Sequence, residues 1–180
     1  MSEVRDLVNT LKVHLAPFGY SECAHSRIGG TDLAAVLAAP KRPRKLLCAI
    51  VDLPEGLTDA RAAARFVNAL RRGLAKQFAS FPWPNRLGTY VILLGDHATF
   101  ESLFPQQAGL TDFPGLQVNS VLGTVLVDAE ALRSRADERW DAPDGCEHFE
   151  HIQTAVAQWC RRCRRQGAKF RTNKWSLSVS

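Results

Sequence analysis

Three apolar segments of this 180-residue chain are each followed within two residues by an aspartate. The segments are 46–51, 90–94 and 121–127, and the aspartates are Asp52, Asp96 and Asp128. If the segments are parallel strands, their carboxylates emerge at the carboxyl edge of one sheet, where open α/β sheets bind ligands. Clustered carboxylates suit a hard cation such as Mg²⁺, and a bound ion lowers the pKa of a water for metal-assisted hydrolysis. The pattern therefore indicates a place for a metal site.

Asp32 adds a fourth carboxylate to this edge. It begins one strand of a predicted hairpin whose turn is centred near Arg42, and Asp52 ends the other strand, so we expect the two to face each other. The candidate ligands of Mg²⁺ or Mn²⁺ are therefore Asp32, Asp52, Asp96 and Asp128. His97, beside Asp96, is a candidate general base.

Local structural roles are an alternative for most of these residues. Asp96 and Asp128 each precede a short helix-compatible segment that an aspartate can cap. Asp32 follows two glycines, where aspartate commonly serves a turn, and a histidine at a helix start is commonly a surface residue. Asp52 precedes Leu53-Pro54 and is less easily explained as a cap.

The elements that position these residues follow from hydrophobic spacing. Apolar periodicity predicts helices over 4–15, from Thr58 to about 76, over 97–104 and over 147–165, and strands over 20–25, 33–39, 46–52, 89–94 and within 116–127. The first three strands form an antiparallel meander, and the later crossovers each hold a helix, which suits parallel connections. We expect one α/β domain over residues 1–166, a single mixed sheet in the order α-β-β-β-α-β-α-β-α with helices packed on it, and a basic tail over 167–180.

Two details of these elements bear on packing and charge. In the helix after Thr58, apolar residues define a buried face, and the basic residues point largely outward: Arg61, Arg65, Arg72 and Lys76. Gly123, inside the last strand, is expected at a bulge or a close approach. The polar stretch 134–144 is expected to connect this strand to the last helix.

The order of helix, three-stranded meander, helix and strand, with Asp32 and Asp52 on the second and third strands, resembles the PD-(D/E)XK nuclease fold. The resemblance covers about the first half of the chain and implies Mg²⁺-dependent phosphodiester cleavage, with Asp32 and Asp52 as ligands. The family pattern has a lysine two residues beyond the second acid, and Pro54 stands there in this chain. Arg61 or Arg65 is a candidate substitute, and an inactive or repurposed relative is the alternative.

Cysteines and histidines near the last helix suggest zinc at first sight: Cys146, His148, His151, Cys160 and Cys163. In one continuous helix, His151 and Cys160 are about 13 Å apart along the axis, too far to share an ion. Cys160 and Cys163 also fall on the apolar face of the helix. We therefore predict that they are buried structural residues.

Composition and motifs exclude several classes of protein. No apolar stretch approaches the roughly 20 residues of a membrane span, and the first residues do not resemble a secretory signal. The chain has five cysteines in no disulfide-rich framework, which favours reduced thiols and a cytoplasmic location. It lacks a Walker A loop, a dinucleotide fingerprint and a Gly-x-Ser-x-Gly sequence.

Charge is strongly segregated along the chain. Residues 1–95 carry 13 basic and 7 acidic groups, residues 96–159 carry 3 and 11, and residues 160–180 carry 7 and none. The basic residues at the end are candidates for binding an anionic partner: Arg161, Arg162, Arg164, Arg165, Lys169, Arg171 and Lys174. A solvated helix end with a mobile tail is the alternative.

Two functions remain open on the sequence alone. The favoured one is a non-enzymatic domain that binds a protein or nucleic acid through the basic C-terminal segment, with no membrane partner. The other is a metal-dependent phosphodiesterase or degenerate PD-(D/E)XK-like nuclease that acts on nucleic acid and uses Asp32 and Asp52, with Asp96 or Asp128 assisting. Only the second requires Mg²⁺.

Overall fold

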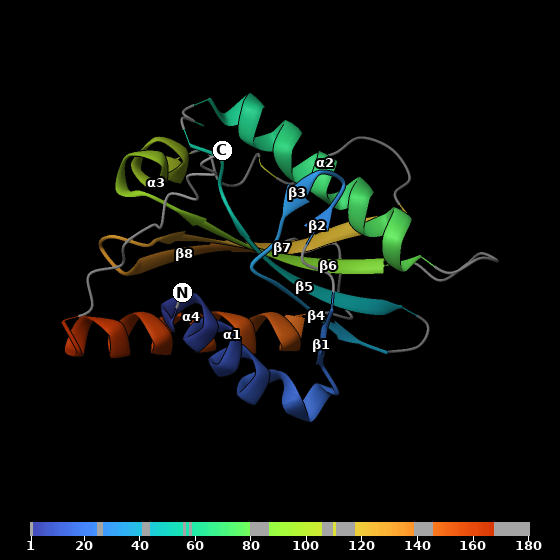
Figure 1. Cartoon of the computed structure of the whole chain (residues 1–180), viewed down its shortest axis with the longest axis horizontal. Helices are drawn as coiled ribbons and strands as arrows, with labels where there is room; N and C mark the ends of the chain where they lie inside the picture. The colour runs from blue at the N-terminus through green and yellow to red at the C-terminus, as the bar shows by residue number, and fades with distance from the viewer. Residues whose placement is uncertain are drawn as a thin grey trace, which may run out of the picture.

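The computed structural model describes residues 2–24, 27–40, 44–55, 57, 59–79, 87–105, 110, 118–138 and 146–167. It confirms the predicted α/β class, with a mixed sheet of six strands in the order β1-β4-β5-β6-β7-β8. Helices α1 and α4 cover one face of this sheet, and α2 and α3 cover the other (Figure 1).

The elements have the following bounds. The sheet consists of β1 (Ser21–Cys23), β4 (Ala35–Ala39), β5 (Lys45–Asp52), β6 (Leu87–Gly95), β7 (Asn119–Asp128) and β8 (Arg133–Glu138). A separate small hairpin is made of β2 (Arg27–Ile28) and β3 (Thr31–Asp32). The helices are α1 (Ser2–Leu15), a 3-10 turn η1 (Ala16–Phe18), α2 (Ala60–Phe78), α3 (His97–Leu103) and α4 (Cys146–Arg165).

Strand directions follow the predicted scheme. β1, β4 and β5 are antiparallel neighbours, and β5, β6 and β7 run parallel. The parallel strands are covered on both faces, which is why their sequences are continuous apolar runs. In β5, for example, Cys48 and Ile50 pack toward α1 and α4, whereas Ala49 packs toward α2.

The start of α2 differs in detail from the sequence prediction. Its N-cap is Asp59, whose carboxylate accepts a hydrogen bond from the Arg61 amide at 2.9 Å. Thr58, the residue expected to cap, lies outside the described residues. An aspartate satisfies the free amides of a first turn as well as a threonine does, so the sequence alone does not choose between the two neighbours.

Gly123 makes the close approach that the sequence indicated. A Cβ atom at this position would lie 2.6 Å from the ring of Phe149 on α4. That ring stacks on Tyr90 with centroids 5.6 Å apart. The pairing of β6 with β7 also shifts here, from Thr89 opposite Val121 to Tyr90 opposite Gly123, so that Leu122 is the extra residue of a bulge.

Replacing Gly123 by alanine is expected to lower the free energy of unfolding by about 1–3 kcal/mol, because the added methyl group forces the Phe149 ring out of position. Urea denaturation measures the change. Gly95→Ala is the matched control, since the nearest atom there is a methyl of Leu53 at 3.3 Å, and its expected loss is below about 1 kcal/mol. Equal losses in the two variants would contradict this account.

Two regions differ from the predicted elements. β8 pairs antiparallel with β7. It includes residues 134–138, which begin the polar stretch 134–144 that we expected to be a connection. The chain between β1 and β4 forms the β2–β3 hairpin instead of a simple turn.

Among the described helices, none combines the length and the hydrophobicity that a transmembrane span needs.

α4 packs as the sequence predicted and is bonded to α1. Its buried face includes Cys160 and Cys163, and burial raises the pKa of the Cys160 thiol to about 11. Three hydrogen bonds link α4 to α1. Trp159 Nε1 donates to the Glu3 carbonyl at 3.1 Å, the Arg162 guanidinium donates to the Thr10 hydroxyl at 2.7 Å, and His14 Nε2 lies 2.7 Å from Gln158 Oε1.

Candidate functional site

The predicted carboxyl edge of the parallel strands is present. Asp52 pairs with Leu94 across β5 and β6, and Gly95 pairs with Asp128 across β6 and β7. Asp96 follows Gly95 directly. Three of the four candidate aspartates therefore lie at one edge of the sheet.

Asp32 occupies a different setting. It pairs with Arg27 in the β2–β3 hairpin, and its carboxylate lies 3.5 Å from the Arg27 guanidinium, with both side chains exposed. The ladder between β4 and β5 starts with Ala35 opposite Ile50. The expectation that Asp32 faces Asp52 across that ladder is therefore wrong, because the tight hairpin takes Asp32 out of β4.

Asp96 and Asp52 have separate local environments. Asp96 caps α3, as predicted, and its carboxylate accepts a hydrogen bond from the Thr99 amide at 2.6 Å. Asp52 ends β5 in an exposed position, where partial desolvation raises the pKa of its carboxyl group. Within the part of the chain that the structure describes, Asp52 has no hydrogen bond or ion pair from its side chain.

Asp128 is the fully buried member of the four aspartates. Its Oδ1 accepts hydrogen bonds from the amides of Glu130 and Ala131 at 3.0 and 2.9 Å, so it caps a tight turn and not the helix that we expected. Its Oδ2 accepts from His97 Nδ1 at 2.9 Å and from Arg133 Nε at 3.2 Å. One carboxylate therefore joins the end of β7, the start of α3 and the start of β8.

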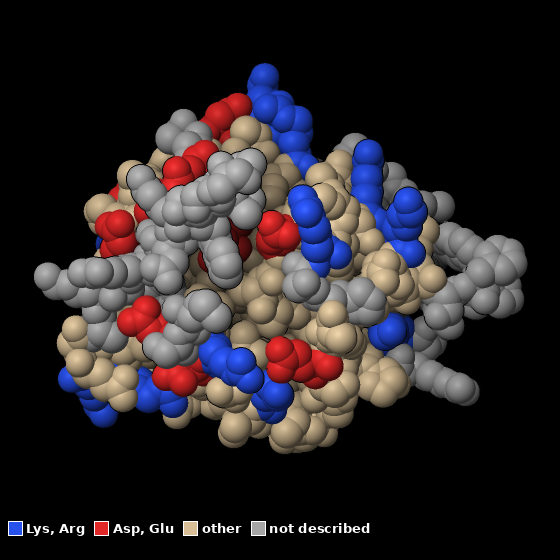
Figure 2. Space-filling model, viewed as in Figure 1, with Lys and Arg blue, Asp and Glu red and all other residues tan. Residues whose placement is uncertain are grey.

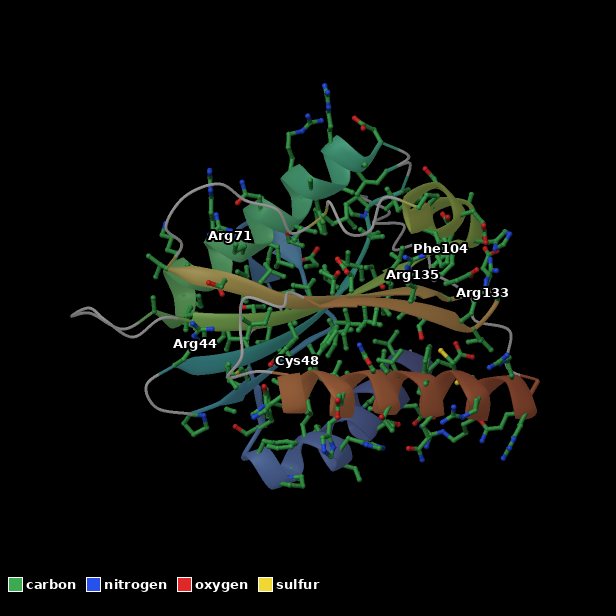
Figure 3. The ribbon with its side chains drawn as sticks, turned by 180° about the vertical axis from the view of Figure 1, so that it is seen from behind. Arg44, Cys48, Arg71, Phe104, Arg133 and Arg135 are labelled. Carbon is green, nitrogen blue, oxygen red and sulfur yellow. The ribbon has the colours of Figure 1, made fainter. Side chains whose placement is uncertain are left out.

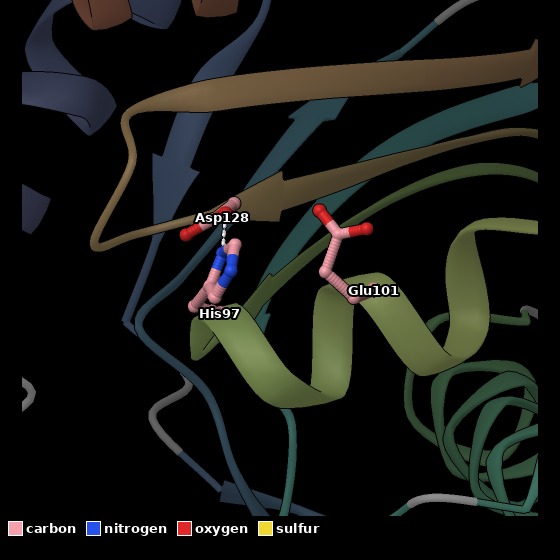
Figure 4. A group of neighbouring side chains, drawn as sticks. All are labelled: His97, Glu101 and Asp128. Atoms are coloured by element: carbon pink, nitrogen blue, oxygen red, sulfur yellow. Dashed lines mark hydrogen bonds and ion pairs between the residues drawn. The ribbon is translucent and has the colours of Figure 1, made fainter.

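We refer to His97, Glu101, Asp128 and Arg133 as the His97 cluster. His97 and Glu101 lie one turn apart on α3, and Figure 4 shows both side chains extending from the same side of this helix, with His97 bonded to Asp128. One ligand atom from each of these three residues lies within 4.8 Å of the others. Arg133 pairs with Glu101 as well as Asp128, and its Nη2 lies 3.3 Å from His97 Nδ1.

Hydrogen bonds in the His97 cluster shift the pKa values of its members. Burial alone would raise the pKa of Asp128, but the bonds from the Ala131 amide, His97, Arg133 and the Glu130 amide lower it. The bond to Asp128 raises the pKa of His97 and that of Arg133. The cluster therefore favours an ionised carboxylate beside protonated partners.

The His97 cluster offers two kinds of chemistry. Because Asp128 engages Nδ1 of His97, Nε2 is the ring nitrogen oriented toward other partners, as in a general base that a carboxylate positions. The side chain of His97 is 53% exposed and is therefore within reach of a ligand. The same imidazole with the two carboxylates is also a donor set for a metal ion.

The sequence pointed to part of this cluster. It predicted Asp128 as a ligand and His97 as a base, but it did not single out Glu101 or Arg133. The four-residue spacing of His97 and Glu101 at a helix start is the signal that could have found the second residue, since such a pair shares one helix face. Among the described residues, Asp32, Asp52 and Asp96 do not join the group within 4.8 Å.

Two arginines of β8 also stack on phenylalanines of the α3 segment. The guanidinium of Arg133 lies 5.1 Å from the centroid of Phe100, and that of Arg135 lies 4.4 Å from the centroid of Phe104. Figure 3 shows Arg133, Arg135 and Phe104 close together at one end of the sheet. These stacks fix the α3 segment on the start of β8.

A second feature is the α2 basic face, by which we mean Arg61, Arg65, Arg72 and Lys76. All four residues are exposed, as predicted. In Figure 2, basic side chains gather over α2. Arg71 lies apart from them, since its guanidinium donates to the Asn119 carbonyl at 3.2 Å and to the side chain of Asn68.

The basic C-terminal residues are only partly described. Arg161, Arg164 and Arg165 are exposed on α4, whereas Arg162 is half-buried and bonded to Thr10. Arg162 is therefore less available to a partner than the sequence suggested. The remaining three candidates, Lys169, Arg171 and Lys174, lie outside the described residues.

Comparisons of the chain with protein-family models, with curated proteins and with solved structures each find no match.

Proposed function

We propose that this protein is a non-enzymatic nucleic-acid-binding protein that holds the phosphate backbone on the α2 basic face. The observation that carries the proposal is the placement of four exposed cations along one helix. At 100° and 1.5 Å per residue, they fall within a sector about 60° wide and about 22 Å long. A row of cations of this length complements a polyanion better than a single charged ligand.

The other residues of α2 also favour a polyanion as the partner of the basic face. Its buried residues, Ala63, Val67, Leu70, Leu74 and Phe78, lie on the opposite side of the helix from the basic face. The segment 60–78 has no acidic residue, although a glutamate four residues from an arginine would stabilise the helix. The like-charged pairs Arg61–Arg65 and Arg72–Lys76 instead repel each other, which a bound polyanion would relieve.

Among the described residues, none of the four cations of the α2 basic face has an ion pair with a carboxylate. Asp59, the nearest acid in sequence, accepts a hydrogen bond from the Arg61 amide at the first turn. The positive charge of this face is thus not neutralised within the described part of the protein. It remains available to phosphate groups.

The proposed binding has little sequence preference. The α2 basic face is proposed to hold the phosphate backbone and not the guanine edges that arginine can read in the major groove, and contacts to phosphates position a nucleic acid without reading its bases. The α2 basic face offers only arginines and a lysine. We therefore expect affinity to depend on charge and salt more than on sequence.

The basic end of α4 is the competing surface. It lies on the opposite side of the sheet from α2 (Figure 1), so the two surfaces do not form one continuous interface. Of its four arginines, Arg162 is bonded to α1. The basic end of α4 is therefore the weaker candidate for the nucleic-acid interface.

The proposal is tested by measuring the affinity for labelled DNA at several salt concentrations. With four phosphate contacts, the slope of log K against log salt is expected near −3.6 for a duplex and near −2.8 for a single strand, from about 0.9 or 0.7 per contact. Replacing Arg61, Arg65, Arg72 and Lys76 by glutamate is expected to abolish binding at low salt. The Arg61→Ala variant should make the duplex slope less steep by about 0.9.

The matched control carries glutamate at Arg161, Arg164 and Arg165, which are exposed on the other side of the sheet. Its affinity for DNA should stay within about threefold of that of the unmodified protein, since charges farther than a Debye length contribute little. If instead this variant loses binding and the α2 variant keeps it, the α2 basic face is not the interface. Thermal melting of both variants verifies that they are folded.

A metal-dependent phosphodiesterase is the weaker proposal. Asp32, one of its two main ligands, is paired with Arg27 in the β2–β3 hairpin, and Pro54 occupies the position of the expected lysine. Incubation of the protein and DNA with Mg²⁺ or Mn²⁺ tests it directly. Cleavage that Asp52→Asn abolishes would favour this function over simple binding.

A cytoplasmic location also belongs to the proposal. The free thiols of Cys48, Cys160 and Cys163 are buried in the core and need no oxidising environment.

A further inference from the structure

We propose that the His97 cluster is a binding site for a divalent transition-metal ion of the zinc class, with His97, Glu101 and Asp128 as ligands and Arg133 as the group that the ion displaces. This inference is independent of the α2 basic face. It rests on three side chains from two elements that present ligand atoms within 4.8 Å of one another.

Asp128 is fixed in an orientation suitable for a ligand. The amides of Glu130 and Ala131 hold its Oδ1, and its buried position restricts other orientations. Its Oδ2 consequently points to the side occupied by His97 Nδ1, 2.9 Å away. A carboxylate fixed in this way loses little freedom when it binds an ion, which favours affinity.

α3 presents the other two ligands on one face. Asp96 caps the start of this helix, so His97 occupies its first position. Glu101 follows four residues later and lies on the same side as His97 (Figure 4). Ligand atoms in a tetrahedral site with bonds of about 2.0–2.2 Å lie roughly 3.4 Å apart, so side-chain movements of about 1 Å convert the present arrangement into a coordination sphere.

The donor set selects the kind of ion. One imidazole nitrogen and two carboxylate oxygens suit Zn²⁺ and similar ions, and three protein ligands leave a fourth position for water. Mg²⁺ prefers oxygen ligands and keeps much of its water. We therefore expect Zn²⁺ to bind here far more tightly than Mg²⁺.

Arg133 is the cation that occupies the cluster in this structure. It pairs with both Glu101 and Asp128 and so neutralises the carboxylates that the metal ion would bind. Its side chain is 46% exposed and can turn to solvent when an ion takes its place. Competition between this guanidinium and the metal ion therefore sets the affinity.

Competition with Arg133 gives the sharpest test. The full chain is treated with a chelator, freed of the chelator, and titrated with ZnCl₂ in a calorimeter. We expect one ion per chain for the unmodified protein, at least tenfold tighter binding for Arg133→Met, and loss of this binding for His97→Ala. Arg135→Met is the matched control, since Arg135 stacks on Phe104 and lies outside the cluster, and its affinity should not change.

Further variants separate this site from other zinc-binding groups. His151→Ala, which alters a histidine on α4, should bind Zn²⁺ like the unmodified protein. Glu101→Gln should bind at least tenfold more weakly. Binding that survives His97→Ala, or that Arg133→Met leaves unchanged, would overturn the proposal.

Two additional measurements separate loss of metal binding from misfolding and from loss of DNA binding. Melting in the presence of chelator shows whether each variant is folded before metal is added. DNA affinity in chelator should be unchanged by His97→Ala, because the α2 basic face is a separate surface. Failure of zinc binding with intact DNA binding, or the reverse, thus distinguishes the two proposals.

Discussion

Replacement of Trp159 by alanine is expected to lower the free energy of unfolding by about 3–5 kcal/mol, the usual cost of removing a fully buried aromatic side chain. Trp159 is completely buried on α4 and is the largest such side chain among the described residues. Its indole also donates a hydrogen bond to the Glu3 carbonyl of α1. The substitution therefore creates a cavity in the core between the sheet and helices α1 and α4, and it weakens the contact between these two helices.

Urea or thermal denaturation measures the loss at Trp159, and two variants calibrate it. Trp159→Phe keeps most of the apolar volume but removes the hydrogen bond, so we expect a loss of about 1–2 kcal/mol. Thr154→Ala, at an exposed position of the same helix, should change stability by no more than about 0.5 kcal/mol. A Trp159→Ala loss as small as that of Thr154→Ala would contradict the packing of α4 described above.

Asp128→Ala is expected to be the most damaging change among the four aspartates that the sequence singled out. It removes an acceptor for two amides and leaves His97 and Arg133 without their buried partner. Hydrogen bonds to a charged group contribute about 1.5–3 kcal/mol, and loss of a shared acceptor leaves several donors unpaired, so we expect about 3 kcal/mol. Chemical denaturation in chelator-containing buffer measures the effect without bound metal.

The other aspartates provide a graded control. Asp96→Ala removes a helix cap and should cost about 1 kcal/mol. Asp32→Ala removes an exposed ion pair with Arg27 and should cost less than about 1 kcal/mol. The expected order is therefore Asp128, then Asp96, then Asp32. If Asp32→Ala were the most destabilising, the assignment of local roles to these carboxylates would be incorrect.

The centre of the sheet was predictable because its strands are buried on both faces. Segments such as 46–51 leave no polar alternation, and their spacing in the chain admits helical crossovers. The helix α2 was equally clear, since its apolar and basic residues separate onto opposite faces. In both cases, one physical requirement, the burial of apolar surface, determines the pattern.

β8 was not predictable in the same way. It is an edge strand, and Arg133, Ser134 and Arg135 at its start are all exposed. Charged residues are common on edge strands because they prevent pairing with other chains, so such a strand does not show a clear apolar alternation. Its pairing with β7 depends on a partner strand and not on its own pattern.

The position of Asp32 depends on a short turn. Gly29 and Gly30 both have positive φ values, 59° and 85°, as a two-residue hairpin turn requires. The sequence prediction places Asp32 at the beginning of a strand that pairs with the strand ending at Asp52. The hairpin instead closes on itself, so Arg27 becomes the partner of Asp32.

The candidate site was predictable as a location but not as a set of residues. The sequence placed Asp96 and Asp128 at one sheet edge because strand direction follows from the crossovers. It did not reveal that His97 would turn toward Asp128, since this depends on side-chain orientation at the start of α3. Arg133 could not be included because it belongs to the unpredicted strand.

The contact between α1 and α4 has a consequence for how the protein reaches its native state. The two helices cover the same face of the sheet, although Glu3 and Trp159 are separated by more than 150 positions in the chain. During synthesis, α1 leaves the ribosome before α4 does and has no partner helix until α4 follows. Long-range contacts of this kind form late and slow folding. The apolar side of α1 is therefore exposed on the nascent chain until α4 is made, and transiently exposed apolar surface of this kind promotes aggregation.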